Sequence, residues 1–322
     1  MSVLNFEKPI YELETKIEEL RNFGSEKKIA LTPEIRKLTE KLDQMKKEVY
    51  GKLTTWQRVQ IARHPDRPYT MDYVSMMMTH FMELHGDRLF ADDSAIVAGF
   101  AKLDNYPVMV MGHQKGRDTK ENIMRNFGCA HPEGYRKAIR LMELAAKFHL
   151  PVIIFIDTPG AYPGVGAEER GQAQAIAENL KNMSRIKTPI IATVIGEGGS
   201  GGALGIGVAD KVCILEHAYY SVISPEGCAS ILWRNAVKAP EAAEALKMTG
   251  EDLLKFGIVE EIIREPMGGA HKDPEVAAAN LKKSLIKYIQ ELSPLSTEEL
   301  LENRYDKFRK IGVFSKGDIA AS

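Results

Sequence analysis

The segment 196–203, called here the glycine turn, has five glycines among its first seven residues. The residues before it, 189–195, are apolar and β-branched, whereas the small residues that follow, 203–209, can begin a helix. A chain with this order makes a tight strand-to-helix turn whose backbone is almost uncovered by side chains. The first N–H groups of a helix have no intrahelical partner, so this turn can bind an anion or stabilise an oxyanion.

Apolar stretches and helical patterns alternate along most of the chain. Strands are expected at 95–103, 108–112, 152–157, 190–195, 212–215, 219–223 and 258–263. Helices are expected at 71–84, 134–149, 167–185, 240–248 and 273–292. This alternation predicts an α/β core with parallel strand pairing.

The first fifty residues follow a different pattern, with apolar residues at helical spacing among Glu and Lys. These positions are Ile10, Leu13, Ile17, Leu20, Ile35, Leu38, Leu42, Met45 and Val49. A break at Gly24-Ser25, and a start at Pro33 with Thr32 as N-cap, divide the segment into two helices. We therefore expect a helical hairpin extension over residues 1–60 and one large domain, with helices at its end, over 61–322.

Composition argues against several classes of protein. Of the 322 residues, 44% are hydrophobic and 27% are charged, which is typical of a soluble globular protein. The formal net charge of −1 gives no general attraction to nucleic acid or to a membrane, and no apolar stretch of about 18 residues occurs. Because Cys129, Cys213 and Cys228 form no CxxC pair and no even set, we expect no disulfide framework and no metal site in this chain. The expected location is the cytoplasm.

The glycine turn fits a dinucleotide-binding pattern. Gly196, Gly198 and Gly201 match G-x-G-x-x-G after a strand, and Glu216 lies where a ribose-binding acid would be expected. Against this interpretation, the interval between Gly202 and the next strand is short for a crossover helix.

The same turn also matches the nucleophile elbow of serine acyl hydrolases. Ser200 lies at the centre of a G-x-S-x-G pattern, and Asp210, His217 and His271 follow in the order of a catalytic triad. A purely structural turn, in which the glycines only permit the tight geometry, is the remaining alternative.

A second glycine-rich loop, 157–166, called here the proline loop, also follows a strand and precedes a helix. Ligands of open α/β proteins bind at the carboxyl ends of the strands, so two such loops at successive strand ends predict one shared pocket. Pro159 and Pro163 restrict the backbone of the proline loop and favour a preformed wall over a mobile lid.

A basic stretch follows the strand predicted at 108–112. It contains His113, Lys115, Arg117 and Lys120, and it extends to Arg125. Such a cluster can hold phosphates or an anionic partner, and a solvated charged face is the alternative. The eight histidines are scattered without the spacing of metal ligands.

Three motifs together resemble a known family. They are residues 157–164 (DTPGAYPG), 196–204 (GEGGSGGAL) and 221–229 (SVISPEGCA), with supporting segments at 62–65 and 112–116. The chain is similar over nearly its whole length to the carboxyltransferase α subunits of bacterial acetyl-CoA carboxylases. That resemblance implies the ClpP/crotonase-like fold, a superhelix of ββα units, in place of a generic α/β sheet.

The resemblance also implies an activity and partners. Members of this family transfer the carboxyl group from carboxybiotin, borne on a biotin carboxyl carrier protein, to acetyl-CoA, and the malonyl-CoA formed serves fatty-acid synthesis. They act with a β subunit that carries a zinc ribbon, in an α2β2 assembly. The amides of Gly201 and Gly202 are then expected to stabilise the oxyanion. The residues expected to form the biotin site are Gly160, Ala161, Tyr162, Gly164, Gly166, Gly199 and Ser200.

Overall fold

A central mixed sheet organises the chain, whose computed structural model describes residues 3–27 and 32–312. The strands of the sheet follow the order β1-β2-β3-β4-β5-β6-β8, and β7 pairs with β5 outside this path. Their bounds are β1 Thr79–Glu83, β2 Ile96–Leu103, β3 Tyr106–His113, β4 Val152–Thr158, β5 Ile190–Gly199, β6 Lys211–Leu215, β7 Tyr219–Ser221 and β8 Glu261–Ile263. β1, β2 and β3 pair antiparallel, whereas the pairs from β3 onward are parallel.

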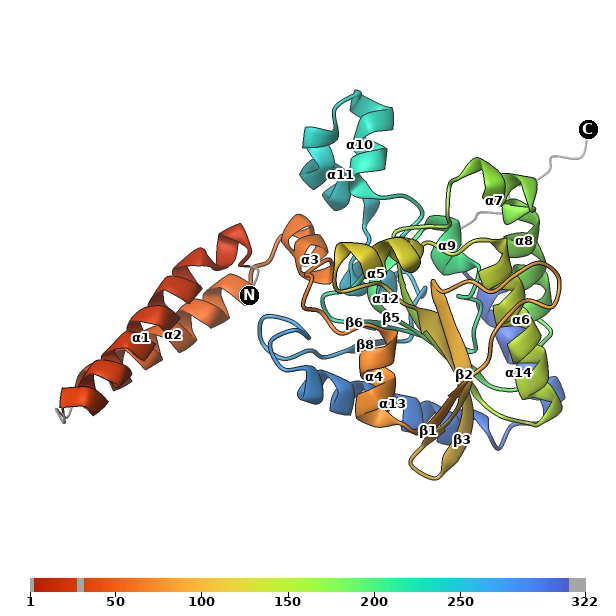
Figure 1. The fold of residues 1–322 in the computed structure, drawn as a ribbon, viewed down its shortest axis with the longest axis horizontal. Helices are drawn as coiled ribbons and strands as arrows, with labels where there is room; N and C mark the ends of the chain where they lie inside the picture. Colours follow the sequence, from red (N-terminus) through yellow and green to blue (C-terminus); the bar gives the residue numbers. More distant parts are fainter. Residues whose placement is uncertain (1–2, 28–31, 313–322) are drawn as a thin grey trace, which may run out of the picture.

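Helices cover both faces of this sheet. α6 and α8 lie on one side, and α4 and α13 lie on the other (Figure 1). The helices of the body are α3 Thr55–Ala62, α4 Thr70–Met77, α5 Thr119–Met124, α6 Pro132–Lys147, α7 Val165–Glu169, α8 Gln172–Met183, α9 Ser200–Leu204, α10 Pro225–Trp233, α11 Ala239–Leu246, α12 Gly250–Lys255, α13 Pro274–Leu292 and α14 Thr297–Arg309. Short 3-10 turns are η1 Asn5–Glu7, η2 Asn126–Gly128 and η3 Ala236–Lys238.

The strand β5 brings the glycine turn out of the main sheet. Its first half, Ile191 to Val194, pairs with β6, whereas its glycine-rich end, Glu197 to Gly199, pairs with β7. All ten residues of β5 are buried, as are the seven of β4 beside it. The two loops that the sequence analysis singled out therefore leave adjacent, rigidly packed strands.

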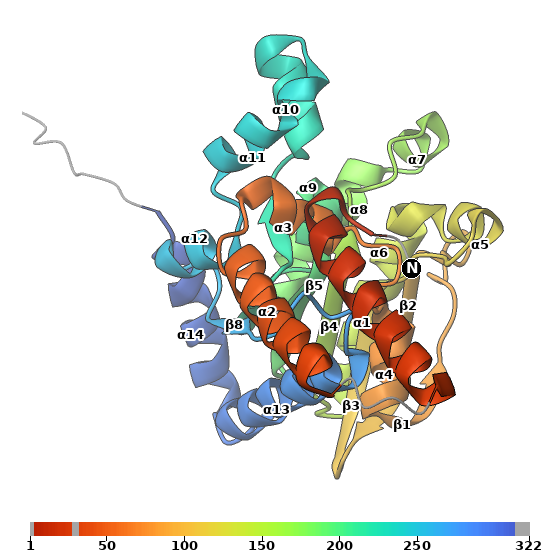
Figure 2. The ribbon, with the colours of Figure 1, turned by 90° about the vertical axis from the view of Figure 1, so that its left-hand side faces the viewer.

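The amino-terminal helices form a small body of their own. α1 (Lys8–Lys27) and α2 (Thr32–Tyr50) lie side by side and project away from the sheet (Figures 1 and 2). They share a separate apolar cluster around Ile10, Ile17 and Leu42. The predicted break at Gly24-Ser25 is wrong, because α1 continues through both residues, and a single helical glycine costs only about 1 kcal/mol.

Residues 28–31, where the two predicted helices are joined, lie outside the described residues, as do residues 313–322 of the predicted large domain. In the described part of the chain, no helix combines the length and the apolar character that crossing a membrane requires.

Two predicted helices are only partly helical. The segment predicted as a helix over 71–84 is helical only to Met77, and from Thr79 it becomes β1, an exposed edge strand that pairs with β2. The helix predicted over 167–185 is divided into α7 and α8 at Gly171, whose φ of 80° interrupts the helix. The helices α3, α5, α10, α12 and α14 were not predicted.

Candidate functional site

The glycine turn and the proline loop are packed against each other. Thr158 of β4 is paired with Gly198 of β5, so the two loops begin at the same level of the sheet. A Cβ atom placed on Gly202 would lie 2.4 Å from the carbonyl carbon of Gly160, which is closer than real Cβ contacts. The close approach of the two backbones therefore requires glycine at position 202.

Ser200 begins α9 in a left-handed conformation, with φ of 50°. Its predecessor Gly199 is extended, so the chain reverses direction sharply between β5 and the helix. Ser200 is exposed and Gly201 is partly exposed, whereas Gly202 is buried. Because α9 starts here, the first amides of the turn lie among the N–H groups that have no partner within the helix.

A cavity of about 550 Å³ opens beside this helix start. Its wall is mostly apolar, with Lys247 at its edge. The lining residues are Ser200, Gly201, Leu204, Tyr220, Ser221, Val222, Leu246, Lys247, Leu253, Phe256 and Ile258. The cavity thus lies on the Ser200 and Gly201 side of the turn, and residues of the proline loop are not among those that line it.

The proline loop forms a fixed wall on the other side of the turn. Tyr162 stacks on the ring of His131 with 4.1 Å between the ring centroids, and its backbone N–H donates to the carbonyl of Ala130. Gln172 donates from its side-chain amide to the carbonyls of both Ala130 and Tyr162. Gly164 packs against the Tyr162 ring, where a Cβ would lie only 2.4 Å from a ring carbon. Gly166 is the second residue of the short helix that follows, α7.

A buried ionic network lies beneath both loops. The Lys115 ammonium donates to Asp157 Oδ1 at 2.7 Å and to Glu197 Oε2 at 2.8 Å. The other oxygen of Glu197 accepts from Arg63 Nε at 2.7 Å and from the Tyr219 hydroxyl at 2.6 Å. Asp157 is the first residue of the proline loop and Glu197 lies within the glycine turn, so the network joins the two loops.

Opposite charges in the network stabilise one another in their ionised forms. Burial alone would raise the pKa of Glu197, but the positive charges of Lys115 and Arg63 outweigh burial and hold that pKa at about 2. Burial alone would lower the pKa of Lys115, but Asp157 and Glu197 raise it overall. At neutral pH Glu197 and Lys115 are therefore ionised, although they are largely withdrawn from water.

His113 lies at the end of β3 and is fully buried. Its Nδ1 atom accepts the backbone N–H of Asp157 at 3.4 Å, which places the imidazole proton on Nε2. Burial lowers the pKa of His113 to about 3, and the nearby backbone of Gly202 opposes this shift. A neutral ring thus fills the space between the starts of the two loops.

Three cations of the basic stretch are engaged in contacts within the chain. Lys115 belongs to the buried network, and Arg125 donates to the carbonyl of Ser94. Arg117 pairs with Asp72, donates to two backbone carbonyls and stacks on the ring of Tyr69. The hypothesis of a phosphate-binding cluster is therefore not favoured for these three residues.

The predicted hydrolase triad is not assembled. Asp210 is bound by Arg304, and His271 stacks on His64 with 3.9 Å between the ring centroids. His217 is buried beside Glu265, to which it donates through its backbone N–H. Among residues 3–27 and 32–312, none of the three side chains forms a hydrogen bond with Ser200. The chain order allowed a triad, but the fold separates its members.

The dinucleotide interpretation is also wrong. The helix after the glycine turn, α9, has five residues, which is too short for the crossover helix of a nucleotide-binding unit. Glu216 accepts hydrogen bonds from the Arg264 side chain and from the backbone of Glu265, so its carboxylate is used to fasten a loop.

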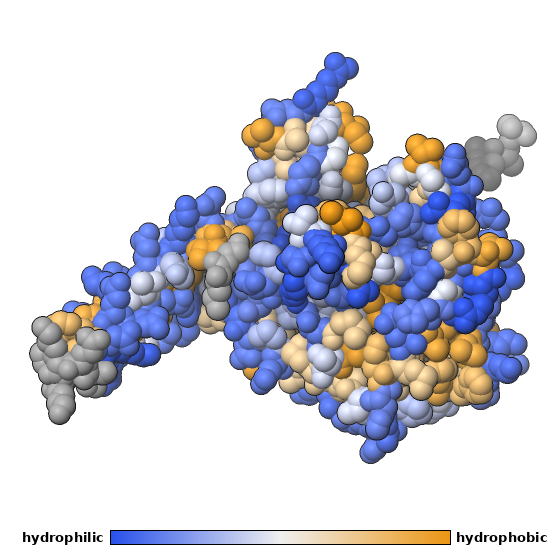
Figure 3. All heavy atoms as spheres, in the orientation of Figure 1, coloured by the Kyte–Doolittle hydropathy of each residue, from blue (hydrophilic) through white to orange (hydrophobic). Residues whose placement is uncertain are grey.

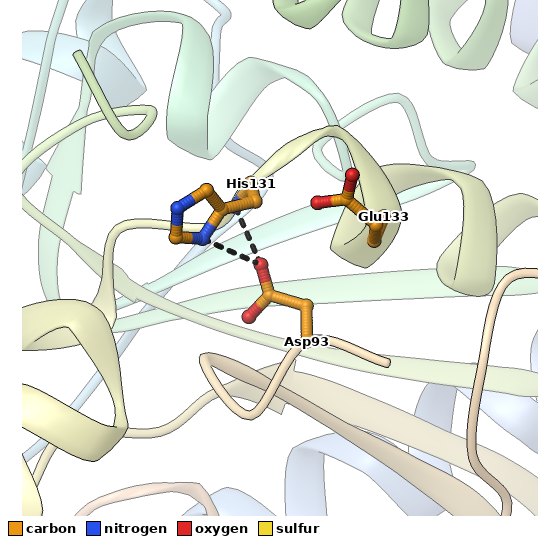
Figure 4. Close-up of side chains that lie close together, drawn as sticks. All are labelled: Asp93, His131 and Glu133. Atoms are coloured by element: carbon orange, nitrogen blue, oxygen red, sulfur yellow. Dashed lines mark hydrogen bonds and ion pairs between the residues drawn. The ribbon is translucent and has the colours of Figure 1, made fainter. Parts of the chain in front are cut away.

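One group of potential metal ligands occurs in the described residues, formed by Asp93, His131 and Glu133 (Figure 4). Asp93 accepts the backbone N–H of His131 and lies 3.5 Å from its Nδ1 atom. Glu133 is paired instead with Arg170, and its pKa, which burial alone would raise, is lowered chiefly by that hydrogen bond. Protein partners thus satisfy these carboxylates, which indicates a structural cluster that supports His131 under Tyr162.

Several solved structures share the fold of this chain. The transcarboxylase 12S structure with methylmalonyl-coenzyme A bound superposes with a TM-score of 0.57 at 18% identity, over 71% of this chain and 42% of that chain. A Pseudomonas malonate decarboxylase hetero-tetramer in complex with coenzyme A gives a TM-score of 0.54 at 16% identity, over 66% of this chain and 85% of that chain. The fold is that of the crotonase-like carboxyltransferases, as the family resemblance implied.

Comparisons of sequence define the family. The family model described as "Acetyl co-enzyme A carboxylase carboxyltransferase-like" matches residues 3–312. The acetyl-coenzyme A carboxylase carboxyl transferase subunit alpha of Geobacter metallireducens is 56% identical over 97% of this chain and 98% of its own length. The subunit of the same name from Thermus thermophilus is 57% identical over 97% of this chain and 99% of its own length. The chain therefore belongs to the family of acetyl-CoA carboxylase carboxyltransferase α subunits. This membership does not support the serine hydrolase alternative.

Proposed function

We propose that this chain supplies the oxyanion-binding half of an acetyl-CoA carboxylase carboxyltransferase. The reaction moves a carboxyl group from carboxybiotin, carried by a separate protein, to acetyl-CoA and yields malonyl-CoA. The observation that carries the proposal is the start of α9, where the turn at Ser200 and Gly201 opens into a cavity of about 550 Å³. That volume is sufficient for the small ring system of biotin.

The amides of Gly201 and Gly202 act on charge that develops during transfer. As the carboxyl group leaves the ureido nitrogen of biotin, negative charge grows on the ureido oxygen. Two preorganised N–H donors stabilise that charge without reorganisation, and a single donor of this kind is typically worth about 3 to 4 kcal/mol. Gly201 faces the cavity, whereas Gly202 is buried against Gly160, so Gly201 is the more accessible donor.

The assignment of the remaining biotin contacts differs between the two loops. Ser200 lines the cavity directly, and Gly199 precedes it. Gly160 and Ala161 support Gly202 from behind, where their backbones leave room only for glycine. We assign Tyr162, Gly164 and Gly166 to the wall on the far side of the turn.

A β subunit completes the site in this proposal. The support for a partner is an exposed apolar surface beside the cavity, formed by Val222, Ile231, Leu232 and Val237, which are 63% to 84% exposed. Apolar side chains appear on the lobe of α10 and α11, above the sheet, in Figure 3. Large exposed apolar patches mark interaction sites. An α2β2 assembly, zinc on the partner subunit and delivery of biotin by a carrier protein belong to the same proposal.

The test is a reconstituted transfer assay with the purified chain, a β subunit and carboxybiotin. Malonyl-CoA is expected from the pair of subunits and not from either subunit alone. Gly201→Pro deletes one N–H and is expected to lower the rate about a hundredfold or more, because one oxyanion donor is lost. The matched control Gly201→Ala retains the N–H, and its Cβ would lie 3.4 Å from Ile176 Cδ1, so its rate should stay near wild type. Near-normal transfer by an assembled Gly201→Pro complex would show that this donor is wrongly assigned.

A further inference from the structure

Lys115 occupies the junction of the two loops without lining the cavity. Its side chain is 12% exposed and its ammonium binds one carboxylate from each loop. We propose that Lys115 is a positioning residue for carboxyl transfer, because it holds the glycine turn and the proline loop in fixed register. This inference rests on the proposed function and names a residue on which the oxyanion geometry depends.

The contacts of Lys115 form a brace across two neighbouring strands. Asp157 Oδ1, at 2.7 Å from Nζ, lies near the end of β4, and Glu197 Oε2, at 2.8 Å, lies near the end of β5. The backbone N–H of Glu197 donates to the same Asp157 oxygen at 2.9 Å, so the brace also fixes main chain. Gly196 is required here, since a Cβ would lie 2.6 Å from Asp157 Oδ1. Three residues separate Glu197 from Gly201.

Further contacts extend the brace toward the cavity wall. Glu197 also binds Arg63, the residue that caps the end of α3, and Arg63 binds Glu226 in the first turn of α10. The Tyr219 hydroxyl of β7 donates to Glu197, and the neighbouring residue Tyr220 lines the cavity. The same carboxylate thus links the glycine turn to two other elements that surround the site.

Removal of Lys115 would leave two buried carboxylates close together, of which Glu197 keeps its ion pair with Arg63. Without the ammonium that binds both, the ends of β4 and β5 lose the contact that sets their spacing, and repulsion between the carboxylates in a medium from which water is excluded lowers stability as well. A displacement of about 1 Å at a reacting centre can cost about a hundredfold in rate. The loss should therefore be in kcat, because the lining residues that bind the ligand remain.

The experiment compares Lys115→Met with Arg304→Met in the assembled complex. Arg304 is a matched control, because it is 1% exposed and pairs with buried Asp210, yet neither residue lines the cavity. Both variants are expected to lower Tm. Lys115→Met is expected to lower kcat about 10- to 100-fold with the KM for acetyl-CoA within about twofold, whereas Arg304→Met should keep wild-type kcat at a temperature where it is folded.

A double variant separates the positioning role of Lys115 from its contribution to the stability of the fold. The double variant Lys115→Met/Asp157→Asn removes the carboxylate at position 157, and Glu197 stays paired with Arg63. Because no buried carboxylate then lacks a cation, Tm should recover even where the single variant fails to fold. If Lys115 positions the loops, kcat of the double variant stays low. Wild-type kcat in either Lys115 variant would overturn the inference while wild-type transfer upholds the proposed function. A wild-type complex that forms no malonyl-CoA would overturn both.

Discussion

At the scale of single residues, adjacent glycines of the glycine turn have different roles. Gly202 is in contact with the backbone of the proline loop, and its missing side chain allows that contact. Gly201 has space around it and faces the cavity, and in the proposed function its contribution is the N–H group. The family resemblance assigned both to one function, because both belong to one motif.

Gly202→Ala should destabilise the chain, whereas Gly201→Ala should not. The Cβ that Gly202→Ala adds has to displace the backbone at Gly160, and overpacking of this kind costs about 1–3 kcal/mol. For Gly201→Ala the change should stay within about 0.5 kcal/mol, as for ordinary surface substitutions. Urea unfolding of both variants measures the difference. Equal stability of the two would show that the loops separate at little cost.

The ionised Glu265 carboxylate should make the stability of the folded chain depend on pH. Burial alone would raise its pKa, but the charge of Arg67 outweighs burial and lowers the pKa from 4.5 to about 2. A lowered folded-state pKa gives stability that is fully present above pH 4.5 and is lost as the pH falls toward 2. The size of this contribution is about 3 kcal/mol.

Glu265→Gln tests this contribution, because the amide does not titrate. The difference in unfolding free energy between wild type and variant should be largest near pH 6 and should shrink at pH values near 3. Urea unfolding at several pH values measures it, and effects of titrating groups that do not interact with Glu265 cancel in the difference. A difference independent of pH would contradict the assigned ion pair.

At the scale of elements, the sequence predicted the strands that are buried on both faces and bounded by turns. The strands β4, β5 and β6 were predicted because each is a continuous apolar run. β1 was missed because its residues are exposed or half-buried and carry no apolar alternation. α14 was missed because its fully buried residues are Leu300 and Arg304, and a buried arginine leaves no apolar stripe in the sequence.

The same distinction applies to the site. The glycine positions were visible as motifs, but the brace of Lys115, Asp157 and Glu197 joins residues 42 and 82 positions apart. Each of the three lies near the end of one of the neighbouring strands β3, β4 and β5. The parallel order of these strands, had it been combined with the charges at their ends, would have indicated the network.

Asn179 should be important for the placement of α9. Its buried side-chain amide donates at 2.9 Å to the carbonyl of Tyr135 in α6 and at 2.9 Å to the carbonyl of Gly205 at the end of α9. Asn179→Leu removes this donor from both buried carbonyls. The free energy of unfolding should fall by no more than about 1–3 kcal/mol for each carbonyl. Thermal unfolding should show a lower Tm, and unchanged Tm would mean that other donors replace the amide.

At the scale of the whole molecule, the chain consists of the helical hairpin and the body around the sheet. Glu7 joins them, since it accepts from Tyr50 at 2.6 Å and lies 3.5 Å from the Lys272 ammonium. The division at residue 60 stays a proposal, and α3 extends across it. Val59 of α3 packs with Tyr219 and Met248 of the body.

Two truncations therefore should differ in their effects. Removal of residues 1–53 retains α3 with its Thr54 cap, so the remaining chain should unfold in one cooperative step with a Tm near that of the full chain. Removal of residues 1–62 also deletes the fully buried Val59 and exposes its partners, at a cost of about 1.5–3 kcal/mol for that side chain alone. Scanning calorimetry of both chains decides the boundary. If the shorter deletion is as damaging as the longer one, the hairpin is part of the body's cooperative unit, because its contacts through Glu7 then stabilise the sheet as much as α3 does.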